Sequence, residues 1–451
     1  MRNKITFIFI VFISISFTAS AQLHILPLKE RAIVQDALLK DRLENLLPAL
    51  MRKEGIDMWL IVAREYNEDP VAKTMLPGTW LNARRRTILL FTDKGVKDGV
   101  EKLAVARYDI GTMFKGAWIP EKEPNQWKRL AELISERSPK KIGINISPQF
   151  AHADGLTKGE WDSLIYYIPA QYISNVVRAE KLAVNWLQLR TENELMLYEN
   201  ICNIGHSIIA EGFSEKVIQP GVTTTDDVVW WLRERIAELK LQTWFHPTVD
   251  VQRSDLGAGD SQRSFATQPG KEIILPGDLL HVDFGITYLG LNTDVQQLAY
   301  VLKPGEKDAP AFLKKGLQTG NRLQDILTTS FAVNKKGNAA LRESLANAKK
   351  ENIVASIYTH PIGYHGHAAG PAIGMWDMQG GVPGSGDYTL QHHTAYAIEL
   401  NAKIKSPEWN NKEIRIMLEE QAVFTPQGVR YINGRQKEFL LIPRGKVHLG
   451  E

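Results

Sequence analysis

The stretch from Gly277 to Asp294 reads GDLLHVDFGITYLGLNTD and carries the clearest structural and chemical pattern in the chain. Its apolar run, Leu279–Val282, has the length of a buried strand and ends on a carboxylate, Asp283. A second carboxylate, Asp294, follows eleven residues later, beyond Gly290. Side chains alternate between the two faces of a strand, so the pattern predicts paired strands that bring both acids together.

Two acids held together inside a core repel one another and resist ionising unless a cation lies between them. Asp283 and Asp294 are therefore candidate ligands of a metal ion. The alternative is a hairpin with two solvated acids, because Asp is common beside turns. This stretch alone leaves both interpretations open.

Length and composition exclude several classes of protein. The 451 residues are enough for two or three domains with a sizeable core. A net charge of +3 is too small to indicate a nucleic-acid-binding protein. The one cysteine, Cys202, allows neither an intrachain disulfide nor a cysteine-based metal site.

The N-terminus has the pattern of a cleaved secretory signal. Arg2 and Lys4 precede an apolar stretch, Ile5–Phe17, and the small residues Ala19–Ala21 follow before Gln22. We predict a signal peptide over residues 1–21 and a periplasmic or secreted mature protein. The alternative is an N-terminal membrane anchor, although the apolar stretch is short for a membrane span. We expect no membrane contact after cleavage.

Residues 22–184 are predicted to form an α/β domain with a mixed sheet, because strand patterns alternate with helix patterns. This region has neither a glycine-rich phosphate loop nor a convergent cluster of acids, His or Cys, so we assign it to scaffolding, assembly or shaping of the active site. The expected helices are Lys29–Lys53, ended by Gly55, and Asn125–Arg137, and the expected strands are Met58–Ala63, Thr87–Phe91, Leu103–Ala106 and Lys141–Ile146.

Residues 185–451 are predicted to form a second domain that carries the chemistry. The motif Thr191–Glu194 is a capping box that opens a long helix, and Thr224–Asp227 caps a second helix. Asp255–Pro269 is rich in Gly, Ser and Gln and is predicted to be a loop.

The segment Thr359–Gly374 reads THPIGYHGHAAGPAIG and places His360, His365 and His367 among glycines. Neutral His is the commonest nitrogen ligand of metals, and Gly lets the backbone approach a ligand closely. The alternative is a flexible His-rich surface loop. Two carboxylates, Glu399 and Glu419, adjoin apolar runs in the last part of the chain; each alone is more often solvated than a ligand.

Together these motifs resemble the pita-bread metallopeptidases, the family of methionine aminopeptidase, aminopeptidase P, prolidase and creatinase. This chain matches the family pattern in both order and spacing. The pattern is an Asp, a second Asp eleven residues later, a His-x-x-Gly-x-x-x-His motif, a Glu, and a last Glu before a Gly turn. The resemblance implies an α+β protein with a creatinase-like N-terminal α/β domain followed by a pita-bread catalytic domain. The matching residues are Asp283, Asp294, His360, Gly363, His367, Glu399, Glu419 and Gly428.

The resemblance also implies a role for each residue. Asp283 would chelate a first divalent ion, and His360 and Glu399 would hold a second. Asp294 and Glu419 would bridge the two ions. Carboxylates with one imidazole suit Mn, Co or Zn, and we expect Mn first. Glu399 would also act as general base, and His367 would stabilise the tetrahedral intermediate.

The chain departs from the family pattern at several places. Ala368 replaces the acid after the second motif His, and Leu400-Asn401 replaces the Pro-Gly after the first Glu. Gln296 and Gln297 stand where one Arg is usual, and Met417 replaces another, with Arg415 nearby. Ser264–Ala266 occupies the place of an upstream His. Whether His246 replaces the missing His stays open.

We therefore expect an exported dinuclear aminopeptidase that removes the first residue from peptides with Pro second. One alternative is a pita-bread hydrolase or lyase acting on a small non-peptide metabolite, as creatinase does; creatinase has lost the ligands that this chain keeps. Another is a catalytically silent binding protein on the same fold, although unneeded buried acids are costly. The resemblance implies a homodimer in which the partner's N-terminal domain lines the active site. The sequence does not identify the metal or the preferred substrate.

Overall fold

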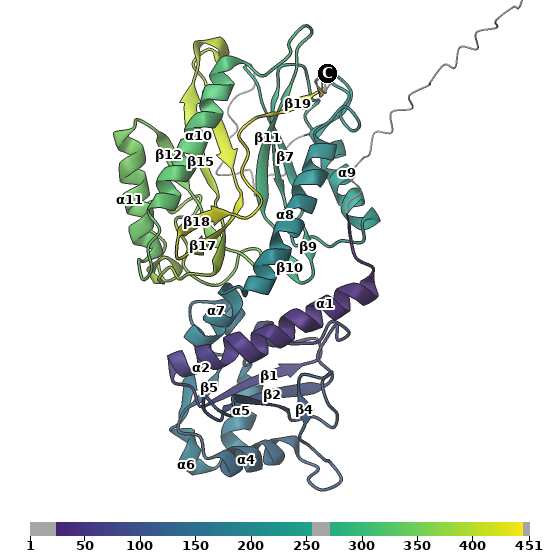
Figure 1. Ribbon diagram of the computed structural model, residues 1–451, viewed down its shortest axis with the longest axis vertical. Coiled ribbons are helices and arrows are strands. Elements are labelled where there is room, and N and C mark those ends of the chain that lie inside the picture. Colours follow the sequence, from purple (N-terminus) through teal and green to yellow (C-terminus); the bar gives the residue numbers. More distant parts are fainter. Residues whose placement is uncertain (1–23, 255–270, 445–451) are drawn as a thin grey trace, which may run out of the picture.

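The computed structural model describes residues 24–254 and 271–444, which form two lobes (Figure 1). The predicted signal peptide and the predicted loop Asp255–Pro269 lie outside the described residues, as does Ser264–Ala266.

The first lobe is built on a mixed six-stranded sheet with the order β4-β3-β2-β1-β5-β6. β1 pairs antiparallel with β2 and parallel with β5, so the predicted mixed α/β arrangement is confirmed. The strands are β1 Met58–Arg64, β2 Arg86–Asp93, β3 Val100–Ala104, β4 Lys115–Gly116, β5 Ile142–Ile144 and β6 Val176–Arg178.

Both faces of this sheet are apolar because helices cover each of them. Trp59 and Ile61 point to one side and pack with apolar residues of α2 and α7, whereas Leu60 and Val62 point to the other side toward α4 and α5. The helices are α1 Leu28–Asp41, a π-helical turn Arg42–Leu46, α2 Leu47–Glu54, α3 Pro70–Lys73, α4 Gln126–Arg137, α5 Lys158–Tyr167, α6 Ala170–Ile173 and α7 Glu180–Gln188. Gly55 ends α2 with φ of 61°, as its position in the sequence predicts.

The second lobe begins with α8 (Glu192–Gly212) and α9 (Thr225–Glu238), and both predicted capping boxes form. These helices pack on a four-stranded sheet with the order β19-β11-β8-β7. Its strands are β7 Thr248–Gln252, β8 Leu279–Phe284, β11 Val295–Val301 and β19 Leu440–Ile442.

A second half of this lobe pairs two more helices with a three-stranded sheet of order β12-β15-β16. The strands of a further sheet, β13-β14-β17-β18, alternate along the chain with those of the three-stranded sheet, and this further sheet supplies His360. The elements are α10 Ala311–Thr329, α11 Gly337–Lys350, β12 Val354–Ile357, β13 His360–Pro361, β14 Thr394–Ala397, β15 Leu400–Lys405, β16 Glu413–Leu418, β17 Gln421–Thr425 and β18 Gly428–Tyr431.

The predicted domain boundary after residue 184 falls within α7. Trp186 and Leu187 pack in the core of the first lobe, whereas Leu195 packs in the core of the second. A buried ion pair joins the lobes, since the Arg42 guanidinium lies 2.7 Å from Glu194. α1, the long purple helix in Figure 1, lies on the first lobe along the junction, and Arg42 follows its last residue.

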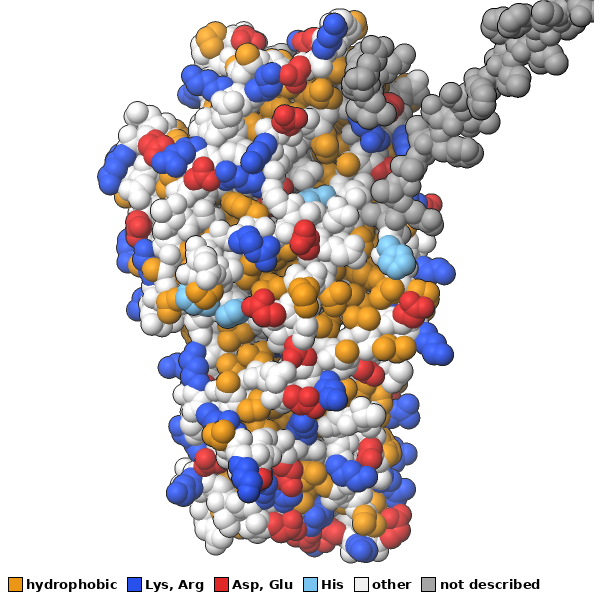
Figure 2. Space-filling model, viewed as in Figure 1, with side chains coloured by type: hydrophobic (Ala, Val, Ile, Leu, Met, Phe, Trp, Pro, Cys, Tyr) orange, Lys and Arg blue, Asp and Glu red, His pale blue; other side chains and the backbone are white. Residues whose placement is uncertain are grey.

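On the face shown in Figure 2, acidic and basic side chains are interspersed over both lobes. Within residues 24–254 and 271–444, every helix is too short or too polar to span a bilayer.

Candidate metal centre

The pairing of β8 with β11 positions the first two candidate ligands. The strands are antiparallel, with Asp283 opposite Gln296, and Asp294 lies immediately before β11. The paired strands predicted from the sequence are confirmed. A small hairpin, β9 Thr287–Tyr288 and β10 Leu291–Asn292, lies between them and turns at Leu289 and Gly290, both with positive φ.

The remaining candidates come from the other sheets. His360 stands on β13 opposite Ala397 of β14, and Glu399 links β14 to β15. Glu419 lies between β16 and β17, and its backbone pairs with that of Gln296 on β11. Two strands and three connections between strands therefore meet at one place.

The structure brings all five predicted ligand side chains together. Donor atoms within each of three overlapping groups lie within 4.8 Å of one another: Asp283, Asp294 and Glu419; His360, Glu399 and Glu419; and Asp294, His360 and His367. His360 Nε2 is 3.6 Å from an Asp294 oxygen and 3.7 Å from a Glu419 oxygen. Asp294 is buried and Asp283 is partly buried, whereas the surface-hairpin alternative requires both acids to be solvated.

Burial and mutual repulsion make these acids resist ionisation. Burial raises the pKa of Asp283 to about 6, and burial with the charge of Asp283 raises the pKa of Glu399 to about 8. The pKa values of Asp294 and Glu419 are raised well above the ordinary range, by burial and then by the neighbouring carboxylates. A bound cation would reverse this penalty.

His360 has the opposite shift and is suited to metal binding. Burial, and then the proximity of His367, lower the pKa of His360 to about 3, so the imidazole is neutral. Asp283 Oδ1, His360 Nε2 and Glu419 Oε1 are buried and have no hydrogen-bond partner among the described residues. Buried polar atoms normally have partners, so these atoms fit divalent metal ions as their missing partners.

His367 lies beside this cluster, more exposed than His360. Its ring centroid is 4.8 Å from that of His360 and 5.1 Å from that of Trp244. Gly366 makes this approach feasible, because a Cβ there would lie 2.2 Å from the Trp244 ring. His365 instead contacts His152 of the first lobe at 4.3 Å between ring centroids.

His246 does not join the cluster. It is exposed, its Nδ1 lies 3.0 Å from the Arg233 guanidinium, and its ring contacts Trp230. The Arg415 guanidinium, another candidate substitute, lies 3.3 Å from Glu413. Met417 stands opposite Asn401 in the β15–β16 pair.

Several residues near the cluster went unrecognised in the sequence as contributors to it. In the sequence Gln296 is only a departure from the family pattern, yet its amide contacts two of the acids. His281 was detectable, because it lies two residues before Asp283 on the same face of β8. Tyr358 contacts the rings of His360 and His367. His152 comes from the other lobe and contacts His365. No local sequence pattern predicts either residue.

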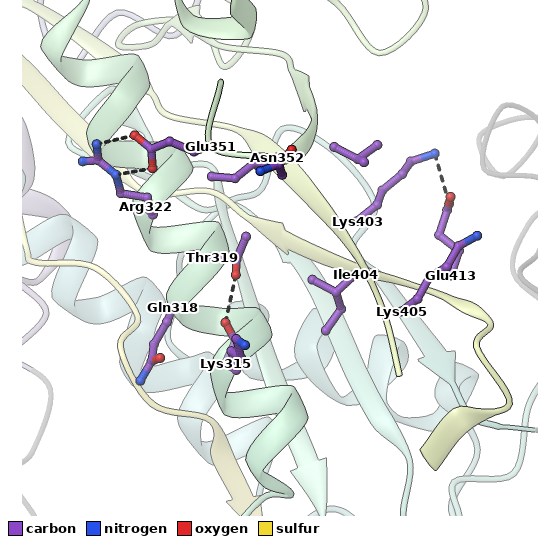
Figure 3. Close-up of a pocket in the computed structure, with 12 residues that line it drawn as sticks. Lys315, Gln318, Thr319, Arg322, Glu351, Asn352, Lys403, Ile404, Lys405 and Glu413 are labelled. Carbon is purple, nitrogen blue, oxygen red and sulfur yellow. Dashed lines mark hydrogen bonds and ion pairs between the residues drawn. The ribbon is translucent and has the colours of Figure 1, made fainter. Parts of the chain in front are cut away.

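A separate groove lies on the outer surface between α10 and the β12–β15–β16 sheet (Figure 3). Its two acids, Glu351 and Glu413, are engaged with Arg322 and Lys403. The groove therefore lacks the crowded, unpaired acids that mark the candidate metal centre.

Solved structures share the architecture of this chain. An X-Pro aminopeptidase from Thermotoga maritima MSB8 matches with a TM-score of 0.60 and 15% identity, over 87% of this chain and 99% of that one. A dipeptidase from Pyrococcus horikoshii OT3 matches with a TM-score of 0.57 and 17% identity, over 89% and 99% of the two chains. The chain has the pita-bread fold.

This result confirms the α+β class and the creatinase-like N-terminal domain ahead of a pita-bread domain. The same fold occurs in the N-terminal domain of the FACT complex subunit SPT16 from Cicer arietinum, at a TM-score of 0.52 and 11% identity, over 92% of this chain and 98% of that one. The sequence matches no protein-family model and no curated protein. Function must therefore be argued from the site itself.

The crowded acids predict an unusual pH dependence for the metal-free protein. Because Asp283 and Glu399 have pKa values of about 6 and about 8, the folded state binds more protons than the unfolded state above about pH 4. The stability of chelator-treated protein should therefore fall as the pH rises from about 5 to about 8. Urea unfolding across this range measures the effect.

Glu399→Gln provides the control, since it removes the group that titrates near the upper end of this range. Its stability should fall less steeply between about pH 7 and about pH 8. Parallel pH profiles for the two proteins would show that the acids are not crowded in solution.

Proposed function

We propose that the protein is an exported, dinuclear metal-dependent aminopeptidase that removes the N-terminal residue from peptides with Pro second. The observation that carries this proposal is the convergence of Asp283, Asp294, His360, Glu399 and Glu419 around buried atoms that lack partners in the described chain. Four carboxylates and one neutral imidazole form a donor set for two divalent ions, with Mn first and Co or Zn as alternatives. When bound, such ions supply Lewis acidity that activates water and polarises a carbonyl oxygen.

Within this centre, Glu399 is the residue suited to move a proton. It is partly exposed, whereas Asp294 and Glu419 are buried. The family resemblance gives Glu399 the role of general base, in which its carboxylate would accept a proton and later return it.

His367 is suited to stabilise the oxyanion. It borders the ligand cluster, is more exposed than His360, and has a Trp244 ring on one side. A neutral imidazole there donates one hydrogen bond to a substrate carbonyl oxygen as negative charge develops on it. Trp244 and Tyr358 flank this position and would limit the access of bulk water.

His152 of the N-terminal domain contacts His365, which belongs to the same loop as His360 and His367. This contact supports a contribution of the chain's own N-terminal domain to substrate binding. A homodimer, in which a partner's domain completes the cleft, is part of the proposal and rests on the family resemblance.

Two other functions share this fold and stay as alternatives. A hydrolase or lyase for a small non-peptide metabolite is favoured by Leu400, Asn401 and Ala368, which replace residues of the peptidase pattern. A catalytically silent binding protein is disfavoured by the cost of keeping unpaired buried acids.

Activity on a peptide panel tests the proposal. Purified protein, stripped of metal and supplied in turn with Mn, Co or Zn, should release the first residue from an Xaa-Pro peptide and leave the matching Xaa-Ala peptide intact. Mass spectrometry of the products measures both reactions. Turnover of a small amide alone would support the metabolite hydrolase, and metal binding without turnover of any substrate would support the silent protein.

Replacement of the two histidines should separate metal binding from catalysis. His360→Ala should lower metal content, because it removes an imidazole whose Nε2 lies 3.6 Å from an Asp294 oxygen and 3.7 Å from a Glu419 oxygen. His367→Ala should keep the metal and lose about 10²–10³-fold in kcat, the usual cost of one oxyanion donor. Metal analysis and steady-state kinetics are measured together for His360→Ala, His367→Ala and His365→Ala, since His365 is the alternative carrier of this role on the same loop. Full activity in metal-loaded His367→Ala would contradict the assigned role.

Export is tested by the mature N-terminus. The sequence pattern leads us to expect cleavage after Ala21, so the protein recovered from the periplasm or medium should begin at Gln22. Edman sequencing or intact mass gives this directly. Recovery of the mature protein with Met1 retained would contradict it.

A further inference from the structure

We propose that Gln296 is a positioning residue that holds Glu399 and Glu419 in the geometry needed for metal binding, and that His281 fixes the orientation of its amide. This inference rests on the proposed dinuclear metal centre.

The Gln296 side chain joins two candidate ligands. Its Nε2 donates to Glu399 Oε1 at 3.0 Å and to Glu419 Oε2 at 2.9 Å. A carboxamide has two N–H hydrogens, so both are used on the two glutamates. Gln296 is buried, which makes each of these hydrogen bonds costly to lose.

The backbone of Gln296 anchors the same contact. Its N–H donates to the Glu419 carbonyl at 3.0 Å, and the Glu419 N–H donates back at 3.4 Å. These bonds connect β11, which follows Asp294, to the link between β16 and β17 that carries Glu419. Main chain and side chain of Gln296 therefore act on the same ligand.

The amide works only in one orientation, with its nitrogen toward the acids and its oxygen away from them. His281 sets this orientation, because its Nε2 lies 2.9 Å from Gln296 Oε1 and must donate to that oxygen. On the other side of the imidazole, Nδ1 lies 3.5 Å from an Asp250 carboxylate oxygen. The hydrogen-bonded pair His281–Gln296 therefore ends on the two glutamates, and the Asp250 carboxylate lies near an Nδ1 that has no hydrogen bond within the described chain.

The Gln296 amide is a neutral hydrogen-bond donor, so it affects the two glutamates differently from a cationic side chain. Gln296 orients the carboxylates without neutralising their charge, which is left for the metal ions. Glu419 Oε1 has no hydrogen-bond partner within the described chain and faces His360 Nε2, so it stays available for coordination. A carboxylate oxygen that accepts one hydrogen bond also retains a lone pair for a metal.

The adjacent residue provides a matched control. Gln297 is also buried, but it points to the other face of β11 and donates to Glu420 Oε1 at 3.3 Å. Glu420 pairs with His206 and is not among the candidate ligands. Gln297→Met therefore removes an equivalent buried amide without touching the proposed centre.

The experiment compares metal affinity in Gln296→Met, Gln297→Met and the unmodified protein. Each is stripped of metal, checked for folding by circular dichroism, and titrated with Mn and Co against a chelator of known affinity. We expect Gln296→Met to weaken binding about 10–100-fold, the usual effect of removing a group that orients a ligand. Gln297→Met should bind as the unmodified protein does, and the visible spectrum of the Co form should change only in Gln296→Met.

Equal affinity in Gln296→Met and the unmodified protein would overturn this inference and leave the proposed function standing. Equal losses in both variants would also overturn it, because they would indicate a general packing effect. Failure of the unmodified protein to bind metal would overturn the proposed function itself. If Gln296→Met does not fold, Gln296→Asn replaces it, because the shorter amide cannot reach both glutamates.

The role of His281 is tested by a double-mutant cycle. If His281 acts through Gln296, His281→Leu lowers the affinity for metal, and the double variant binds no more weakly than Gln296→Met alone. Additive losses would show that His281 acts independently and would overturn that part of the proposal.

Discussion

The repulsion among four crowded carboxylates is the constraint on which the second lobe depends. Asp283, Asp294, Glu399 and Glu419 occupy one small space, and their pKa values are all raised. A flexible chain would relieve this repulsion by moving the acids into water. The paired strands prevent that movement, because each acid adjoins a strand that is hydrogen bonded to a neighbour. The unfavourable electrostatic energy therefore remains in the metal-free fold, and the binding of cations would relieve it.

Local rules account for much of what the sequence revealed. Both capping boxes, the Gly55 stop and the strand before Asp283 depend on neighbours within a few residues, so short patterns were sufficient to predict them. Asp283 and Asp294 were predictable as a pair because one strand pairing brings them together. The other ligands come from distant strands, and only the resemblance to a known family connected them with this pair.

The residues that the sequence did not reveal act across elements. Gln296 looked like a loss of the family's basic residue, and its meaning appears only when β11 lies beside Glu419. His152 belongs to another lobe, and a lone His carries no information about its distant partner His365. His246 was considered because it is close in sequence, yet it packs on Arg233 and Trp230. Proximity along the chain was therefore a poor guide to the surroundings of the metal centre.

A buried charge network also connects the junction between the lobes with the loop that carries His360 and His367. Glu194 pairs with Arg42 and with Arg190, and the two guanidinium carbons lie 5.0 Å and 4.7 Å from the centroid of the Tyr364 ring. Tyr364 belongs to the loop that carries His360 and His367. One carboxylate compensating two buried cations requires all three side chains to stay in place. Because Arg42 follows α1 of the first lobe, docking of the two lobes and the position of the histidine loop depend on the same buried charges.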